Sequence, residues 1–460
     1  MKKYFLLFGA ALILLLTKVD RLIVDGDTFW AIKVGEWIAK NKSIPYKDTF
    51  SWTAYGKPWV AHEWLFDYLI YKFHAGLGYY GIILFVFIGL FFITYYLWKL
   101  YAEENKNPVL TIIVFTIVIF MLQCGIAARP HLYGYVFFIY FFYVLYRRRK
   151  LLWTLPPVAV VWANMHGSVV LGIAMVLLQL TYDTVYYYIE SKKLSISKNL
   201  LAVSFIVPLC SLINPYGVEL WFTSFHLITN KINKQIIEWQ PPDFREPTWL
   251  IAYLVIIIFT VCVSYSYKGI ADKRKLCLLS IYLLGTFYEA ITGMRYFPYL
   301  AICWGLFFLT LLPNDMFSER GWNKKILLLF SVLVIVIILN AGKPPLTLEE
   351  VIDKKEWPVD AVKHLDSEKI YNKYVWGGYL IYKDIPVFID GRADVYWKNS
   401  DVFKDYLDIN NLNKDPIDLL NKYDVEQIII PVDSALDFYL KRAGCIEKYR
   451  DDIAVIYNIY

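Results

Sequence analysis

The sequence predicts a polytopic α-helical membrane protein with a small α/β domain at its C-terminal end. Of its 460 residues, 58% are hydrophobic and only 19% are charged, which is too apolar for a soluble globular chain. Aromatic residues reach 18%, and many flank the apolar runs as they do at membrane interfaces. From about residue 343 charged residues return, and short strand-like and helical runs alternate. The chain therefore divides into a predicted transmembrane domain, residues 1–342, and a predicted α/β domain, residues 343–460.

About eleven apolar segments are candidates for membrane-spanning helices, because a span needs ~20 apolar residues and sometimes fewer. The candidates are residues 4–19, 79–99, 108–124, 132–146, 151–165, 168–189, 199–214, 248–267, 276–294, 297–312 and 325–341. The first segment resembles a signal peptide, but no small-residue cleavage site follows it. We therefore expect it to be retained as a helix.

The basic residues predict the orientation, because positive charge favours cytoplasmic loops. With the N-terminus inside and eleven spans, every basic cluster becomes cytoplasmic. These clusters are residues 2–3, 147–150, 192–198, 273–275 and 324–325. The first outer loop, residues 20–78, and the C-terminal domain then lie outside the cytoplasm. Since the basic residues explain topology, they do not indicate nucleic-acid binding.

The predicted outer loops collect most of the unusual polar residues of the apolar half. They are Asp27, His62, Glu63, Arg129, His131, Asn164, His166, Asn214, Glu238 and Arg295. Intramembrane and interfacial ionisable groups are costly and usually functional. Their concentration on one face indicates chemistry at a membrane surface.

Two acidic residues open the first outer loop. Asp25 and Asp27 precede a predicted amphipathic helix at about residues 29–39, and a second such helix follows residues 61–64 and runs to about residue 73. Asp27 could act as a general base that takes the proton of an acceptor hydroxyl. Alternatively, Asp25 and Asp27 could hold Mg²⁺ or Mn²⁺ through their oxygens. A third possibility is that they only cap the helix, with Asp27 as its N-cap.

Two arginines lie at predicted outer helix ends. The guanidinium forks of Arg129 and Arg295 suit a phosphate at low dielectric, because they stay charged and bind two oxygens at once. The alternative for Arg295 is an interfacial ion pair, for example with Glu289. Glu238, in a long loop, is a candidate second catalytic carboxylate or a solvated loop acid.

Three histidines also lie in these loops. No local ligand pair links His62, His131 and His166, so structural or acceptor-positioning roles are favoured over a metal site.

The C-terminal domain shows alternating patterns. Residues 385–389, 426–431 and 453–457 are predicted strands, and residues 359–365, 416–423 and 435–443 are predicted helices. Asp390 and Arg392 follow the first of these strands. They are candidates for contact with an acceptor.

The order of these elements resembles the GT-C-type, lipid-phosphate-sugar-dependent glycosyltransferases. The resemblance rests on the first span, the acidic residue, two amphipathic helices and the second span. Motifs that carry it further, toward a group of bacterial membrane proteins of this type, include residues 27–30, 50–52, 62–64, 129–130, 164–167 and 214–217. Many members have Lys-Pro-Pro or His-Pro-Pro before the second span, whereas this chain has Lys57-Pro58-Trp59 and His62-Glu63-Trp64.

The resemblance implies a membrane glycosyltransferase with a polyprenyl-phosphate sugar donor and a glycan, lipid or protein acceptor on the outer face of the cytoplasmic membrane. Asp27, or else Asp25, matches the essential acidic residue, and Arg295 matches an arginine that holds the departing phosphate. Trp30, Trp52 and Trp64 would stack on sugar rings or anchor the interfacial helices. The alternatives are a lipid-linked glycan transporter or flippase, and a non-catalytic membrane assembly protein.

Overall fold

The computed structural model describes residues 25–230, 235–266, 272–312, 352, 356–399 and 401–459. They form two compact units. Unit 1 comprises the described parts of Val86–Gly217 and Ile228–Lys343, and unit 2 those of Asp20–Phe85, Val218–Leu227 and Pro344–Tyr460. The predicted first outer loop thus groups with the C-terminal segment. The first and last predicted spans, residues 4–19 and 325–341, lie outside the described residues.

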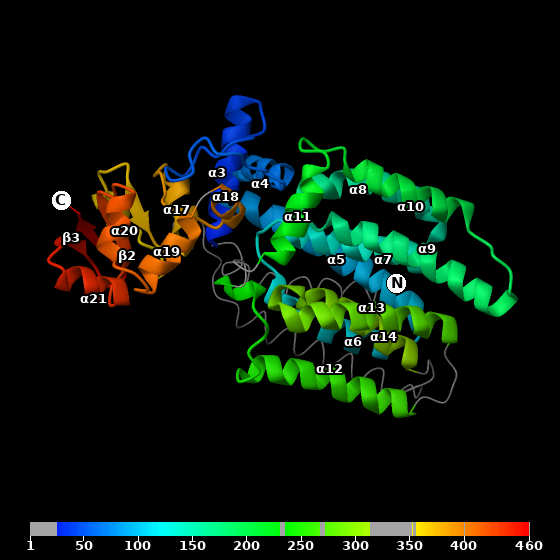
Figure 1. Cartoon of the computed structure of the whole chain (residues 1–460). Coiled ribbons are helices and arrows are strands. Elements are labelled where there is room, and N and C mark those ends of the chain that lie inside the picture. The colour runs from blue at the N-terminus through cyan, green and yellow to red at the C-terminus, as the bar shows by residue number, and fades with distance from the viewer. Residues whose placement is uncertain are drawn as a thin grey trace. The chain divides into compact units, whose positions relative to one another are not determined.

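Unit 1 consists of helices. They are α5 (Tyr79–Glu104, which begins in unit 2), α6 (Pro108–Leu122), α7 (His131–Tyr146), α8 (Leu155–Met165), α9 (Val169–Ser191), α10 (Lys198–Ser211), α12 (Pro247–Ser266), α13 (Lys273–Thr292) and α14 (Phe297–Leu311). Each predicted span between residues 79 and 312 coincides with one of them. Residues 151–154 instead form the end of a 3-10 helix, η2 (Arg149–Thr154), ahead of α8. Helices α8, α9 and α10 lie side by side (Figure 1).

The helices of unit 1 suit a lipid environment. Five described helical segments are long and apolar enough to cross a membrane: Tyr79–Glu104, Pro108–Gly125, Val169–Ser191, Lys273–Thr292 and Met294–Leu311. Large apolar side chains such as Phe205, Leu209 and Leu284 are more than 60% exposed on the protein surface. Exposed apolar area on this scale is costly in water and favourable against lipid tails. The chain is a multi-pass membrane protein.

Ion pairs bring two of the predicted cytoplasmic basic clusters together in unit 1. Glu104 pairs with Arg147 and, at 3.8 Å, with Lys275. Asp183 pairs with Arg149 and, at 3.0 Å, with Arg274. Both clusters therefore meet at one end of the helices.

The other end of α7 carries a predicted outer-loop residue. Arg129 precedes α7 and Arg147 follows it, so the 16-residue helix separates them by ~24 Å. Helix α13 likewise begins at Lys273 and ends before Arg295. Within unit 1 the predicted cytoplasmic and outer residues thus lie at opposite helix ends.

Unit 2 contains a four-stranded sheet in the order β1-β2-β4-β3. The strands are β1 (Ile370–Asn372), β2 (Gln427–Pro431), β3 (Ile446–Arg450) and β4 (Ala454–Asn458). β1 is parallel to β2, whereas β4 is antiparallel to both β2 and β3. Accompanying helices are α17 (Gly377–Tyr382), α18 (Ala393–Asn399), α19 (Val402–Asn410), α20 (Pro416–Lys422) and α21 (Ala435–Arg442), most of them visible beside the sheet in Figure 1. The apolar centres of β2 and β4 are buried.

Most predicted elements of this domain are confirmed. Residues 426–431 and 453–457 correspond to β2 and β4, and residues 416–423 and 435–443 to α20 and α21. Residues 359–365 contain only a short 3-10 helix, Ala361–His364.

The predicted strand at 385–389 is wrong. Only Val387 makes a bridge, to Ser51 of the first loop. The buried Asn372 side chain accepts from the Phe388 N–H and donates to the Ile389 carbonyl, at 2.8 Å each. A side chain therefore satisfies backbone groups that a neighbouring strand would otherwise pair.

The first loop forms two packed helices, α3 (Gly26–Asn41) and α4 (Trp64–Leu77), which extend the two predicted amphipathic helices. They approach closely at Gly35, where a Cβ would lie 2.0 Å from the Asp67 carbonyl oxygen. The N-cap of α3 is Asp25 and not Asp27, because the helix begins at Gly26. The side chain of Asp25 accepts from the Asp27 N–H at 2.8 Å.

A buried arginine joins the first loop to the C-terminal domain. The side chain of Arg392 is 1% exposed and lies between Asp48 and Asp390, both fully buried. Its Nη1 donates to Asp48 Oδ1 at 2.6 Å, while Nε and Nη2 bind Asp390 at 2.8 and 2.6 Å. The guanidinium also lies over Trp59, 4.8 Å from the ring centroid. Burial of these charges is tolerable only because each has partners.

We expect Arg392→Ala to lower the free energy of unfolding of the chain by ~3–5 kcal/mol, because it leaves two buried carboxylates without their cation. Thermal unfolding of the purified protein, followed by intrinsic fluorescence, measures the change. Arg442→Ala, at an exposed position near the end of α21, is the matched control and should change stability by less than ~0.5 kcal/mol. Equal stability of the two variants would contradict the role assigned to Arg392.

Candidate functional site

Asp27 lies in the first turn of α3, in unit 2. Its Oδ1 accepts a hydrogen bond from Trp30 Nε1 at 3.0 Å. The same oxygen lies against Gly391, where a Cβ would stand only 2.0 Å away. The side chain is half-buried. The Trp30 indole and the Gly391 backbone thus hold this carboxylate, and the residue as a whole stays partly exposed.

Glycines allow the start of α3, which carries Asp27, to lie in this place. The carbonyl oxygen of Gly26 lies 1.8 Å from where a Cβ of Gly378 would be. The start of α3 therefore packs backbone to backbone on the start of α17. Only glycine allows such close contact without displacing one chain.

A second group of charges in unit 2 surrounds His62. Its Nε2 lies 3.4 Å from Glu63 Oε1, and its Nδ1 contacts the Val60 carbonyl at 3.2 Å. Burial alone would lower the pKa of His62, but Glu63 and then Asp394 raise it to about 9. Burial raises the pKa of Asp394 to about 6.

Asp67 of α4 is the most isolated member of this group. It is 1% exposed, and neither carboxylate oxygen has a hydrogen-bond partner among the described residues. Burial, reinforced by Glu63, raises its pKa well above the usual value. The sequence offers a signal for it, because Asp67 stands between Phe66 and Ile70 on the buried face of an amphipathic helix.

The residues predicted to contact an acceptor are buried. Asp390 and Arg392 bind each other and Asp48, so their charged groups are not presented to solvent. Trp30 is 6% exposed, and its indole N–H is directed to Asp27. Trp64, at the start of α4, is half-buried.

Unit 1 brings together three residues that the sequence placed in different outer loops. Arg129 Nη1 donates to Glu238 Oε2 at 2.9 Å, and Arg295 Nη1 to Glu238 Oε1 at 3.4 Å. The Arg295 guanidinium lies 3.9 Å from the centroid of the Trp239 ring, within range of a cation–π interaction. The partner of Arg295 is thus Glu238 and not Glu289. We call Arg129, Arg295 and Glu238 the arginine cluster.

The cluster keeps Glu238 ionised. Burial would raise the pKa of Glu238, but Arg295 and Arg129 lower it to about 2. A carboxylate with such a low pKa is a poor general base near neutral pH, since it holds a proton only weakly. The arrangement instead favours an electrostatic role for Glu238.

Two other predicted histidines of unit 1 make local contacts. His131 Nε2 lies 2.8 Å from the Gly125 carbonyl, and His166 Nδ1 lies 2.6 Å from Ser168 Oγ. Ser168 Oγ also accepts from Trp162 Nε1 at 3.0 Å. Both rings therefore fix the turns that begin α7 and α9.

Metal binding by Asp25 and Asp27 stays a prediction. Within residues 25–459, as far as the structure describes them, no three His, Cys, Asp or Glu side chains are grouped as metal ligands. Asp25 caps α3 and Asp27 binds Trp30, so each already uses one oxygen.

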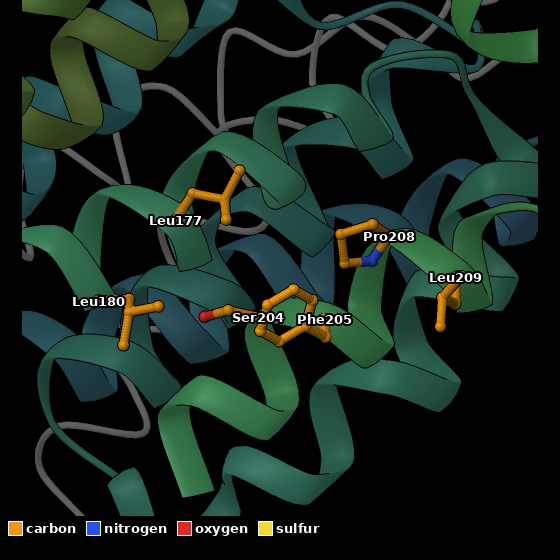
Figure 2. Close-up of a pocket in the computed structure, with 6 residues that line it drawn as sticks. All are labelled: Leu177, Leu180, Ser204, Phe205, Pro208 and Leu209. Atoms are coloured by element: carbon orange, nitrogen blue, oxygen red, sulfur yellow. The ribbon is translucent and has the colours of Figure 1, made fainter. Parts of the chain in front are cut away.

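An apolar cavity of about 360 Å³ lies between α9 and α10 of unit 1. Figure 2 shows Leu177 and Leu180 of α9, and Phe205, Pro208 and Leu209 of α10, around it. Ser204 is the polar member of the lining, and its hydroxyl is bound to the Leu200 carbonyl at 2.8 Å. The cavity contains none of the charged residues above and offers no groups for acid–base chemistry.

Two solved structures share this architecture. The apo oligosaccharyltransferase of Archaeoglobus fulgidus matches with a TM-score of 0.58 at 10% identity, over 92% of this chain and 69% of that one. ArnT from Cupriavidus metallidurans, bound to undecaprenyl phosphate, matches with a TM-score of 0.50 at 12% identity, over 99% and 97%.

The chain has the GT-C fold. At 10–12% identity, the likeness concerns the fold and does not transfer residue roles. No protein-family model matches the sequence, and no curated protein does. Residue roles in this chain must therefore be argued from its own side chains.

The raised pKa of His62 predicts a pH-dependent stability. Folded His62 holds its proton up to about pH 9, whereas the unfolded residue loses it near 6.5. The stabilisation is therefore complete below pH 6.5 and is lost as the pH rises through 9, a change of ~3 kcal/mol. Melting temperatures from pH 6 to 10 should fall for the wild type and less for His62→Gln. An exposed histidine, His364→Gln, should keep the wild-type slope; parallel curves for all three proteins would refute the assignment.

Proposed function

We propose that this protein is a membrane glycosyltransferase that moves a sugar from a polyprenyl-phosphate donor to an acceptor on the outer face of the cytoplasmic membrane. The observation that carries the proposal is the arginine cluster, in which two guanidinium groups share one anion. Such a pair suits a phosphate held at low dielectric. The GT-C fold and the undecaprenyl phosphate bound to ArnT support a lipid-linked phosphate as that anion.

Asp27 is the proposed general base. The acceptor oxygen attacks the anomeric carbon of the donor sugar, and the bond from that carbon to the phosphate oxygen breaks. Asp27 takes the acceptor proton, while the polyprenyl phosphate leaves with the electron pair of the broken bond. Arg129 and Arg295 stabilise the negative charge that develops on the leaving phosphate.

Asp27 is better suited to this role than Glu238. Asp27 accepts a hydrogen bond from the neutral indole of Trp30, whereas two arginines surround Glu238 and lower its pKa. An indole N–H orients a carboxylate without adding a positive charge next to it. Asp25 is the alternative base, although its side chain caps α3.

Asp27→Asn should reduce transfer at least ~100-fold, because the amide cannot accept the proton. The measurement uses the native host with this gene deleted and complemented by each variant. Mass spectrometry of its envelope glycans, lipids and proteins shows which sugar is lost and whether it returns. Asp25→Asn should retain transfer, because asparagine caps helices as well as aspartate.

Asp418→Asn, at an exposed position on α20, controls for loss of a charge in unit 2. Full transfer by a folded Asp27→Asn protein would contradict the proposal. Movement of labelled lipid-linked sugar across vesicles, without any transfer product, would instead favour a flippase.

Gly391→Ala tests the placement of Asp27 without touching its carboxylate. The new methyl would lie 2.0 Å from Asp27 Oδ1 and must displace it. A displacement of about 1 Å costs on the order of 100-fold in rate. We expect the same loss of glycan in the complementation assay, with normal protein levels. Gly76→Ala on α4, where no atom lies within 4 Å, is the control and should complement fully. Full activity of Gly391→Ala would show that this contact does not position the base.

A further inference from the structure

The arginine cluster has an internal anion in place. One Glu238 oxygen faces each guanidinium, at 2.9 and 3.4 Å. A phosphate bound by two arginines would be held in the same way, with a different phosphate oxygen bound to each guanidinium group. Glu238 and a phosphate ligand therefore compete for the same donors.

The surroundings of Glu238 fix its backbone and leave its side chain partly exposed. The Met294 N–H donates to the Gln240 carbonyl at 2.9 Å, which ties the turn η4 (Ile237–Trp239) to η5 (Met294–Tyr296). The Glu238 side chain is 38% exposed, against 21% and 23% for Arg129 and Arg295. A rotation of the Glu238 side chain alone can therefore release both arginines to a ligand.

Charge makes this competition unequal between substrate and product. The donor is a phosphodiester with one negative charge, whereas the polyprenyl phosphate released by transfer carries nearly two. Two arginines alone would hold the product more tightly than the donor, and the product would block the site. A tethered carboxylate competes at a high effective concentration and lowers the apparent affinity of any ligand it excludes.

We propose that Glu238 is a built-in competitor for the lipid phosphate, which occupies Arg129 and Arg295 between turnovers and promotes release of the polyprenyl phosphate product. The inference rests on the proposed function, because it takes the arginine cluster as the phosphate site. It assigns Glu238 a positioning and release role and not that of a base.

Binding of undecaprenyl phosphate to the full-length protein in nanodiscs tests the inference. Glu238→Gln should bind this lipid roughly fivefold more tightly than the wild type, because the competitor no longer carries a charge. Glu238→Asp, which keeps the charge on a shorter side chain, should lie between them. Glu246→Gln removes an exposed charge a few residues away and should bind like the wild type. Arg295→Ala should bind more weakly.

Unchanged or weaker binding by folded Glu238→Gln and Glu238→Asp would overturn the inference, since Glu238 would then only hold the arginines in place. If the wild type does not bind undecaprenyl phosphate, or Arg295→Ala binds as the wild type does, the phosphate site itself is wrong, and with it the proposed function. A second readout is inhibition of transfer by added undecaprenyl phosphate. Glu238→Gln should be inhibited at roughly fivefold lower concentration of this lipid.

Discussion

The buried ion pairs of Arg392 are the constraint on which the architecture of unit 2 depends. The loop between α3 and α4 is irregular. Backbone hydrogen bonds from Asp48 to Lys57 and from Trp59 to Tyr46 close it on itself, but by themselves they leave its position on the C-terminal domain free. Arg392 removes that freedom, because a buried guanidinium must meet both Asp48 and Asp390 or leave charges uncompensated. Backbone bonds of Val387 with Phe50 and Trp52 then continue the attachment. A loop from the start of the chain is thereby fixed on a domain from its end.

This attachment determines where Asp27 stands. Asp390 and Gly391 are adjacent, so the residue that anchors Arg392 also sets the backbone against which the Asp27 carboxylate rests. Gly378 does the same for the carbonyl of Gly26. The position of one acidic side chain thus depends on charge pairing and on the absence of two Cβ atoms. Neither feature belongs to α3 itself, although α3 carries the residue.

The sequence predicts what is local and misses what joins distant segments. Apolar runs and helical periodicity predict α3, α4 and the described spans, and they also predict β2 and β4. The same apolar pattern fails at 385–389, because Asn372 and the first loop take its hydrogen bonds. From the sequence, Asp390 and Arg392 are expected to be exposed, because they follow a predicted strand. In the structure Arg392 is buried against Asp48, which lies 344 residues away in the sequence. Likewise, spacing alone cannot pair Glu238 with arginines 109 and 57 residues distant.

The two proposed carboxylates illustrate how environment separates roles that residue type leaves open. Two cations hold Glu238 as a permanent anion, so it can exchange with another anion but hardly accept a proton. Asp27 accepts from a neutral indole and lies against a glycine backbone, which together orient its carboxylate. A transfer that makes both a proton and a phosphate anion needs one group for each product. In the proposed function, Asp27 takes the proton and the arginine cluster binds the phosphate.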